Sequence, residues 1–563
     1  GKSTEEPTRE PTPREVSGEQ NAETGHQESA VIPEGAESVA ERVPEAGHQE
    51  FTQVPESQGP EVVREHPPTG RSLWARSFNA RSIEHTAMDA QDNIIITGRF
   101  DSSADFGSKT ITSSNGRGHF IAKMDGKGNW LWVEPINMKG GLGIMDIVMD
   151  AQGSLTIVGH FYASITFGNT TLTSPKPMNS AIFVARIDKN GKWLWAKRTG
   201  GQGSHNKGGG IALDKSGGVF ITGCFKDTAR FGIIQLVEKG RTPKSKGDIF
   251  VARLDKNGKW LWATRAGGSL GQTGIYRIAT DDKDNAIVSG SFGPSGDFGS
   301  TLLTAQGSSS LFVAKIDKNG KWLWAKGIVG RHGRYLRDTH LVDAQGGSVL
   351  SGSFSGTLTF GGTTLSTPHS RIRRYFVAKL DKNGKWEWVK SPTNPLIGNI
   401  TMDRSGVIYM IGSFDRTANF GTTTLTSRGG RDLFVAKLDK NGKWLWVKQA
   451  GGSESEGANE LVMDKSGGIQ ICGGFKGNAN LGGFILKSKG ARDLFVGKLD
   501  KHGKWLSAKR AGSKGYEGCN GITVDGKGDT IITGRFEQSA DFGSTTLTSK
   551  KIYSLFVWKL QLK

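Results

Sequence analysis

The residues best suited to bind a charged group are arginines gathered in two short stretches. One stretch reads VGRHGRYLRDTH over residues 329–340, and the other reads HSRIRRYF over residues 369–376. A guanidinium group presents a planar fork of N–H donors that matches the oxygens of carboxylate, sulfate and phosphate groups. The candidate anion-binding residues are Arg331, Arg334, Tyr335, Arg337, Arg371, Arg373, Arg374 and Tyr375.

Two other interpretations of the basic residues compete with this site. The arginines can pair with neighbouring acids such as Asp338, or only keep exposed loops soluble, because surface ion pairs are common and weak. Turns of sequence Asp-Lys-Ser-Gly and Lys-Asn-Gly-Lys also recur along the chain and predict a lysine-rich rim. Such a rim is either a solvated surface or a second surface that attracts polyanions.

Patterns typical of catalysis or metal binding are missing from the sequence. The histidines after residue 70 include no HExxH motif or other close metal-binding pair. The Asp-Lys-Asn-Gly-Lys turns lack the later glutamate that completes a calcium loop. Neither a G-x-S-x-G elbow nor a phosphate-binding loop is present. We therefore expect no catalytic residue, no metal site and no bound cofactor.

The three cysteines, Cys224, Cys472 and Cys519, lie in separate parts of the chain without paired or metal-ligand spacing. Their spacing favours buried structural thiols over a disulfide framework or a catalytic nucleophile.

One segment recurs along the chain and predicts the elements that carry these residues. A clear copy, LFVAKLDKNGKWLWVK, covers residues 433–448. A phenylalanine at the end of a repeated strand-like segment recurs at intervals of 60 to 67 residues, which gives eight units. These phenylalanines are Phe100, Phe161, Phe225, Phe292, Phe354, Phe414, Phe475 and Phe536.

Each unit contains four short runs with strand character. In the sixth unit they read GNITMD, GVIYMIGSF, LFVAKLD and KWLWVK. Asn441-Gly442 predicts a type I′ turn, which places Lys437 opposite Trp446, Asp439 opposite Trp444 and Leu438 opposite Leu445. Because helical periodicity is absent, residues 71–563 are predicted to form an all-β, eight-bladed β-propeller of four-stranded antiparallel blades.

A basic residue holds the Lys437 position in every unit, and we expect its stem to lie on the facing tryptophan ring as a structural cation–π contact. The less favoured alternative is a set of ligand-binding lysines. Fourteen of the fifteen tryptophans fill two repeated slots, with Trp558 outside them, and are expected to form core between blades. The eight basic residues are Lys123, Arg186, Arg253, Lys315, Lys379, Lys437, Lys498 and Lys559.

The pattern begins and ends within one hairpin. LWARSF at residues 73–78 is a fourth strand with no strands before it, and LFVWKLQLK at residues 555–563 is a third strand with no fourth strand after it. Pairing the two strands closes the ring and removes its exposed edges. The arithmetic of this pairing places Lys559 opposite Trp74.

The run FVAKLDKNGKWLW, followed by AGG, a variable loop, GIALDKSGGVFITGCF and a threonine-rich stretch, resembles the bacterial β-propeller repeat family usually described as seven-bladed. The resemblance covers residues 71–563, although this chain has eight units. It implies a secreted or cell-surface bacterial protein and supplies no catalytic residue. Eight-bladed quinoprotein dehydrogenases carry a similar docking pattern, but here Asp439 and Trp446 are one residue closer and no adjacent cysteine pair is present.

Residues 1–70 differ in composition from the rest. They contain fifteen Glu but only five Lys or Arg, with no Trp or Cys, whereas the whole chain of 563 residues has a net charge of +19. Such a segment buries too little apolar surface to fold, so we predict a disordered acidic tether. The chain starts at Gly1, which suggests a processed N-terminus and leaves room for a lipid anchor on a residue now missing. No apolar run has membrane-spanning length.

Two classes of function remain. The first is a non-enzymatic extracellular or cell-surface module that binds an acidic polysaccharide or a protein partner in a surface assembly. The second is a propeller enzyme, either quinoprotein-like or glycan-cleaving, which needs carboxylates or histidines converging on the ring axis. First strands such as GGGIALD and IGNITMD offer mostly apolar residues, glycine or isolated polar residues, so the sequence favours the binding module. Nucleic acid is a poor candidate partner because the tryptophans are used by the fold.

Overall fold

The computed structural model describes residues 67, 69–201, 203, 206–239, 247–268, 274–307, 310–330, 333–369 and 371–563. The chain divides into two units, Gly1–Glu61 and Val62–Lys563, and every described residue belongs to the second unit. The predicted tether therefore lies almost entirely outside the described residues and stays a prediction. Thr69, which we assigned to it, donates its main-chain N–H to the Ala508 carbonyl at 3.0 Å.

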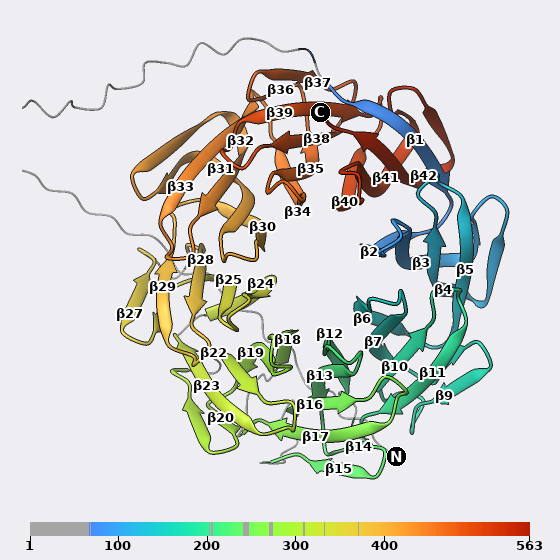
Figure 1. The fold of residues 1–563 in the computed structure, drawn as a ribbon, viewed down its shortest axis with the longest axis vertical. Coiled ribbons are helices and arrows are strands. Elements are labelled where there is room, and N and C mark those ends of the chain that lie inside the picture. The colour runs from blue at the N-terminus through green and yellow to red at the C-terminus, as the bar shows by residue number, and fades with distance from the viewer. Residues whose placement is uncertain are drawn as a thin grey trace, which may run out of the picture. The chain divides into compact units, whose positions relative to one another are not determined.

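Every regular element in the described part of the chain is a β-strand, as the all-β prediction requires. The same antiparallel order of first, second, third and fourth strand recurs from sheet to sheet, and we call each such group a meander. In the second unit the meanders follow one another round a ring, with the first strands nearest the centre (Figure 1). This is a β-propeller arrangement.

The first strands are β2 (Ser82–Met88), β6 (Leu142–Met149), β12 (Lys207–Leu213), β18 (Gly274–Thr280), β24 (Gly333–Val342), β30 (Leu396–Met402), β34 (Gly457–Met463) and β40 (Glu517–Val524). The second strands are β3 (Ile94–Asp105), β7 (Leu155–Phe161), β13 (Val219–Phe225), β19 (Ala286–Phe292), β25 (Ser348–Phe354), β31 (Ile408–Phe420), β35 (Ile469–Phe475) and β41 (Thr530–Asp541). The third strands are β4 (Thr110–Met124), β10 (Ala181–Ile187), β16 (Asp248–Leu254), β22 (Ser310–Ile316), β28 (Arg374–Leu380), β32 (Thr423–Leu438), β38 (Asp493–Leu499) and β42 (Thr546–Gln561). The fourth strands are β5 (Trp130–Lys139), β11 (Trp193–Thr199), β17 (Trp260–Ala266), β23 (Trp322–Val329), β29 (Trp386–Lys390), β33 (Trp444–Gly452), β39 (Trp505–Ala511) and β1 (Arg71–Phe78).

A further hairpin extends from the connection between the second and third strands. In three meanders it is continuous with them, which makes β3, β31 and β41 long. In the others it is separate: β8 (Ser164–Phe167) with β9 (Thr170–Thr173), β14 (Thr228–Phe231) with β15 (Ile234–Val237), β20 (Ser295–Phe298) with β21 (Thr301–Thr304), β26 (Thr357–Phe360) with β27 (Thr363–Ser366), and β36 (Asn478–Leu481) with β37 (Phe484–Lys487). Each hairpin approaches the fourth strand of the preceding meander, as β8 pairs with β5 and β36 with β33.

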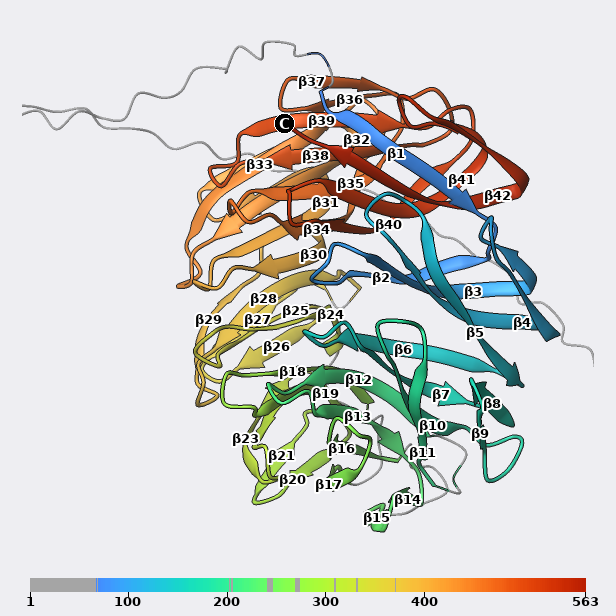
Figure 2. The ribbon, with the colours of Figure 1, turned by 45° about the vertical axis from the view of Figure 1, so that its right-hand side comes forward.

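The two ends of the second unit share one sheet. Strand β1 pairs with β42, and Trp74 lies opposite Lys559, as the sequence predicts. Figure 2 shows β1 running beside β42 and β41. Trp558, the tryptophan outside the repeat, is fully buried and packs against Phe542, while its Nε1 donates to Ser72 Oγ at 2.9 Å. Because Ser72 stands in an empty tryptophan slot, the Trp558 ring compensates for the missing indole.

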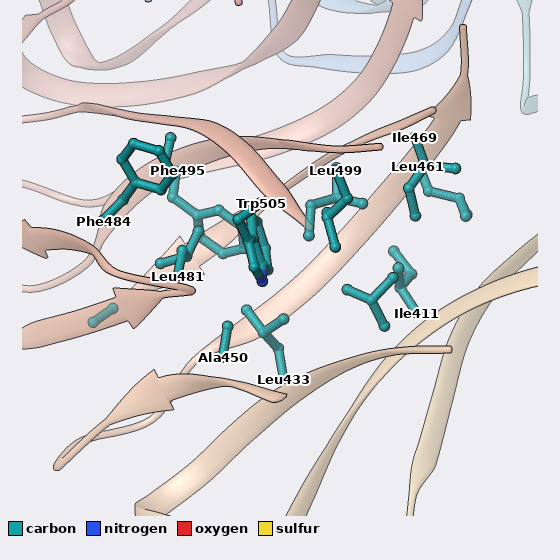
Figure 3. Packing of buried hydrophobic residues seen from close by; sticks show 14 of the residues in the cluster. Ile411, Leu433, Ala450, Leu461, Ile469, Leu481, Phe484, Phe495, Leu499 and Trp505 are labelled. Atoms are coloured by element: carbon teal, nitrogen blue, oxygen red, sulfur yellow. The ribbon is translucent and has the colours of Figure 1, made fainter. Parts of the chain in front are cut away.

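The core lies within and between the meanders because the central second and third strands bury both faces. Figure 3 shows Trp505 among Leu481, Leu499 and Leu433, which come from two neighbouring meanders. A glycine recurs in the second strand, and at Gly412 a Cβ atom would lie 2.1 Å from the Leu396 carbonyl oxygen. The strands can therefore approach closely only with glycine at this position.

The turn between the third and fourth strands differs from the predicted one. Asp439 Oδ1 accepts hydrogen bonds from the main-chain N–H groups of Asn441 and Lys443, and Gly442 has a φ of 78°. Asn441 does not have a positive φ, so the turn is not type I′. Leu438 consequently pairs with Trp444, and a register shift restores the predicted pairing of Lys437 with Trp446. The pairings of Asp439 with Trp444 and of Leu438 with Leu445 were wrong.

The repeated basic residue forms an ion pair with the aspartate of the first turn in its own meander. Lys315 Nζ lies 2.7 Å from Asp281 Oδ2, and both side chains are buried. The expected contact with tryptophan is wrong, because the carboxylate takes the cation. At Lys437, where no such pair forms among the described residues, Nζ lies over the Tyr409 ring instead. The pairs are Lys123–Asp89, Arg186–Asp150, Arg253–Asp214, Lys315–Asp281, Lys379–Asp343, Lys498–Asp464 and Lys559–Asp525.

The two repeated tryptophans pack within a meander and connect it to the next one. The first packs edge-on against the hairpin phenylalanine, as Trp444 does on Phe420 at a centroid distance of 5.2 Å. The second donates its Nε1–H to a turn carbonyl of the next meander, as Trp388 does to Lys440 at 3.0 Å. Equivalent bonds run from Trp74, Trp132, Trp195, Trp262, Trp324 and Trp446. The repeated segment therefore docks one meander on the next.

Two of the cysteines form a disulfide, which corrects the expectation of separate thiols. Cys472 on β35 is bonded to Cys519 on β40, with their Cα atoms 6.2 Å apart. The residues are 47 positions apart in the sequence, but β35 and β40 are neighbours because adjacent meanders pack against each other. Cys224 is free, and burial raises the pKa of its thiol.

Candidate functional site

The two arginine stretches lead into the same edge of one sheet, in the meander β24–β25–β28–β29. Arg334 of β24 pairs with Ser353 of β25, which pairs in turn with Tyr375 of β28. Strands β24 and β28 therefore start at the same edge of the sheet, on either side of the end of β25, as the sequence suggests. Arg331 lies outside the described residues, and only the backbone is described for Arg334, Tyr335 and Arg337.

The second stretch is better defined. Arg371 and Arg373 are exposed, and neither guanidinium has an ion pair or hydrogen bond among the described residues. Arg374 is partly exposed, and its Nη1 donates to the Ser366 carbonyl at 3.2 Å. Tyr375 is only 4% exposed and belongs to the hydrophobic core, so its ring cannot face a ligand at the surface. Strand β28 is buried on both faces from Tyr375 onward, which argues against Tyr375 as an anion-binding residue, and its part in the site stays a prediction.

The lysine turns gather at the opposite edge of the meanders. The side chains of Lys382, Lys440 and Lys501 are exposed, whereas their main-chain carbonyls accept the docking tryptophan bonds. The turn aspartates use their oxygens locally, as Asp381 Oδ1 accepts the N–H groups of Asn383 and Lys385. In the described part of the chain, no group of three or more His, Cys, Asp or Glu residues is placed to hold a metal ion.

Polar residues on the first strands form a feature that the sequence analysis missed. Each lies just after a β-bulge and four residues before the turn aspartate: His85, Asp146, Arg277, Asn399 and Glu460. Neighbouring first strands are linked by them, because Asn399 Nδ2 donates to Glu460 Oε2 at 2.7 Å and Asp146 Oδ2 accepts from Ile211 N at 3.2 Å. The expectation of isolated polar residues on the first strands is therefore wrong.

The charges of these axial residues influence one another. Burial lowers the pKa of His85, while the Asp146 charge opposes that shift. Burial raises the pKa of Asp146 despite the nearby Arg277. On β24, burial lowers the pKa of His340 to about 3. A sequence signal existed: the residue type at this position changes from unit to unit, although the position after it is isoleucine in five of the eight units.

Buried carboxylates form a second missed feature, near the start of two first strands. Glu517 is fully buried beside Asp493, and its Oε2 accepts from Ser513 N at 3.3 Å while its Oε1 has no partner among the described atoms. Burial and the Asp493 charge raise the pKa of Glu517 to about 8. Glu456 beside Asp432 repeats the arrangement, and burial raises its pKa to about 7. Glu517 is therefore held mainly in its protonated form at neutral pH, and Glu456 below neutral pH.

Comparison with known proteins supports the fold and leaves the activity open. No family model matches this chain. It is 24% identical over 427 residues to an uncharacterized WD repeat-containing protein of Acanthamoeba polyphaga mimivirus, a match that covers 62% of this chain. The matched region spans only 30% of that relative's length. The relative and the strand order together support a β-propeller repeat protein.

Similar solved structures include proteins with different activities. One is a eukaryotic initiation factor, with a TM-score of 0.39 and 10% identity, covering 85% of this chain and 98% of that chain. Another is a puromycin hydrolase, with a TM-score of 0.38 and 10% identity, covering 81% of this chain and 59% of that chain. A third is a virginiamycin B lyase from Staphylococcus aureus, with a TM-score of 0.31 and 9% identity, covering 71% of this chain and 96% of that chain.

Proposed function

We propose that this protein is a non-catalytic binding and structural module of a bacterial cell surface, which holds an acidic polysaccharide in a surface assembly. The propeller fold supports a binding or structural role, because the repeated Trp residues dock one meander on the next and the repeated Lys–Asp pairs hold each meander together. Residues that depart from the repeat are then free to recognise a partner. Among the described residues, no helix is long and apolar enough to cross a membrane.

The observation that carries this proposal is the exposed arginine pair Arg371 and Arg373, at the edge where β24 also begins. Their guanidinium groups have no carboxylate partner among the described residues. An anionic polymer can therefore engage them without first breaking an ion pair. Arg334 pairs with Ser353, which pairs in turn with Tyr375, so its backbone lies at the same edge. It is a third cationic residue there.

The first prediction concerns this arginine edge. The variant R334S/R371S/R373S is expected to bind immobilised heparin several-fold more weakly than the wild type, because it lacks three guanidinium groups. Arg374 is retained because it bonds the Ser366 carbonyl. Binding is measured by interferometry at two salt concentrations, with the melting temperature as a check on folding.

The matched control removes three charges from the opposite edge, in the variant K382S/K440S/K501S. This variant should retain most of the affinity, since only general electrostatic attraction is reduced. Full affinity in the arginine variant together with weak binding in the lysine variant would overturn the site and move it to the lysine rim.

Two finer features belong to the same proposal. The disulfide between Cys472 and Cys519 favours an extracellular location, because disulfides persist in oxidising compartments. Recovery of both residues as reactive thiols from native protein would argue against that location. We also infer that each four-stranded meander is one blade, which gives eight blades from the recurring strand order. Electron-microscopy class averages with a different number of spokes would contradict this count.

A further inference from the structure

A polar groove lies between the fourth strand β11 and the hairpin β14–β15. Its volume is about 940 Å³. The charged and hydrogen-bonding side chains that line it are Lys176, Arg198, Thr199, Asp227, Thr228, Arg230 and Gln235. The residues that line the groove are distant in sequence from the arginine stretches at 329–340 and 369–376. They depart from the repeat at other positions.

Two equivalent gaps elsewhere in the ring are closed by ion pairs. On β17, Arg265 Nη1 lies 3.1 Å from Asp248 Oδ2, and Nη2 lies 3.5 Å from Asp297 Oδ2. On β39, Arg510 Nη1 lies 2.6 Å from Asp493 Oδ2, and Nη2 lies 4.0 Å from Asp541 Oδ2. In both gaps one aspartate begins the third strand and the other precedes the Phe-Gly of the next hairpin.

Register shows that Arg198 is the equivalent of these two arginines. Arg198 pairs with Phe183, just as Arg265 pairs with Phe250 and Arg510 pairs with Phe495. Two residues before Phe183 stands Ala181, in place of Asp248 or Asp493. Before the hairpin Phe-Gly stands Arg230, in place of Asp297 or Asp541. Both acids are thus lost, and one of them is replaced by a second base.

The consequence is a pair of unsatisfied guanidinium groups facing the same groove. Arg198 and Arg230 are exposed, and neither side chain has an ion pair or hydrogen bond within the described part of the chain. The backbone beneath them is fixed, because Thr199 Oγ1 donates to the Arg230 carbonyl at 2.7 Å and Arg230 N donates to Gly200 O at 3.3 Å. Asp227 is the one carboxylate among the lining residues, and its N–H donates to Glu238 Oε2.

We propose that this groove binds one acidic sugar unit of a polysaccharide, with Arg198 and Arg230 on its sulfate or carboxylate group. Two guanidinium forks suit an oxyanion, and the exposed amide of Gln235 suits sugar hydroxyls. The inference rests on the proposed function and adds a second, more enclosed site to it. A polymer that reaches both sites gains avidity from simultaneous contact.

The test compares the full-length wild type with R198S/R230S on three immobilised polymers. Heparin carries sulfate and carboxylate, dextran sulfate carries only sulfate, and polygalacturonate carries only carboxylate. We expect R198S/R230S to lose roughly tenfold or more in affinity for heparin, because each lost charged hydrogen bond matters on this scale. The two simpler polymers show which oxyanion the groove prefers.

A second variant rebuilds the closed gap. A181D/R230D restores both acids of the sister gaps, so it should fold with an Arg198 ion pair and bind as weakly as R198S/R230S. The control K197S/R117S removes two other exposed cations and should bind like the wild type.

The outcomes separate this inference from the proposed function. If R198S/R230S and A181D/R230D bind the polymers as well as the wild type does, while R334S/R371S/R373S does not, the groove is overturned as a site. The proposed function then stands. A wild type that binds none of the three polymers overturns both. Equal losses in R198S/R230S and in K197S/R117S would reduce the groove to general electrostatic attraction and overturn it as a site.

Discussion

At the scale of single residues, the buried carboxyl of Glu517 links the stability of the protein to pH. Its ordinary pKa is near 4.5, and burial raises the pKa in the folded protein to about 8. The folded protein therefore holds a proton that the unfolded chain releases within this window. Stability is then greatest below the window and is lost as the pH rises through it.

The variant E517Q should remove this dependence, because the amide stays neutral at every pH. Its melting temperature is expected to match the wild type at about pH 5 and to exceed it increasingly up to about pH 9. Calorimetry across this range measures the difference. D415N, which neutralises an exposed carboxylate away from the buried pairs, should show no such trend. A constant difference between E517Q and the wild type would show that Glu517 is not protonated in the folded protein.

Single residues also show where the sequence analysis failed. Glu517 and Asp493 are 24 positions apart and give no sign of contact until the meanders are placed side by side. The ion pair of Lys315 with Asp281 was missed because pairing arithmetic considered only the two strands of one hairpin. The acid losses around Arg198 were equally hidden, since they matter only once the hairpin of the next meander is known to lie there.

At the scale of elements, the turn between the third and fourth strands does two things at once. Gly442 adopts a φ of 78°, which favours glycine, and a Cβ atom there would lie 2.6 Å from Cδ2 of Trp388 in the preceding meander. Gly467, in a first turn, has the same φ of 78° but nothing within 4 Å of such a Cβ. A substitution at Gly467 therefore tests backbone strain alone, whereas a substitution at Gly442 tests strain together with the contact to Trp388.

We expect G467A to cost about 1 kcal/mol, from strain in the left-handed conformation alone. G442A should lower the melting temperature distinctly further, because the Trp388 ring must also move and its bond to the Lys440 carbonyl is disturbed. Thermal unfolding of both variants at one protein concentration gives the comparison. Equal shifts would mean that the turn and the tryptophan do not dock.

The sequence was most informative about the strands and the order in which they pair. Repetition made the strands and their order predictable, because eight copies of one pattern average out local ambiguity. The type of turn was not predictable from Asn441-Gly442 alone. The side chain of Asp439 accepts two main-chain N–H groups and thereby selects a turn with the positive φ on the glycine only. The β-bulges that place His85 and Asp146 likewise leave no clear mark in the pattern.

At the scale of the whole second unit, closure of the ring depends on one strand from the start of the chain. Strand β1 covers the edge of β42, supplies the Ser72 partner of Trp558, and carries Trp74, which bonds the Gly126 carbonyl of the next meander. This closure was predictable because the two partial hairpins complete each other. The disulfide between Cys472 and Cys519 was not predictable, because nothing in their sequence spacing indicates that their strands are adjacent.

Two truncations test whether β1 is what closes the ring. Removal of residues 1–66 should leave the melting temperature nearly unchanged, because β1 and its contacts remain. Removal of residues 1–78 should lower it and cause concentration-dependent association, because β42 becomes an unpaired edge and Trp558 loses its cover. Calorimetry and light scattering report the two effects.

A synthetic peptide of residues 69–80 provides the decisive arm of the experiment. Added to the shorter protein, it should pair with β42 and restore both the melting temperature and the monomeric state, as an added strand does at an open sheet edge. A peptide with Trp74 replaced by Ser should restore less, since the bond to the Gly126 carbonyl is lost. If the protein without residues 1–78 melts like the wild type and stays monomeric, the ring does not depend on pairing between its first and last strands.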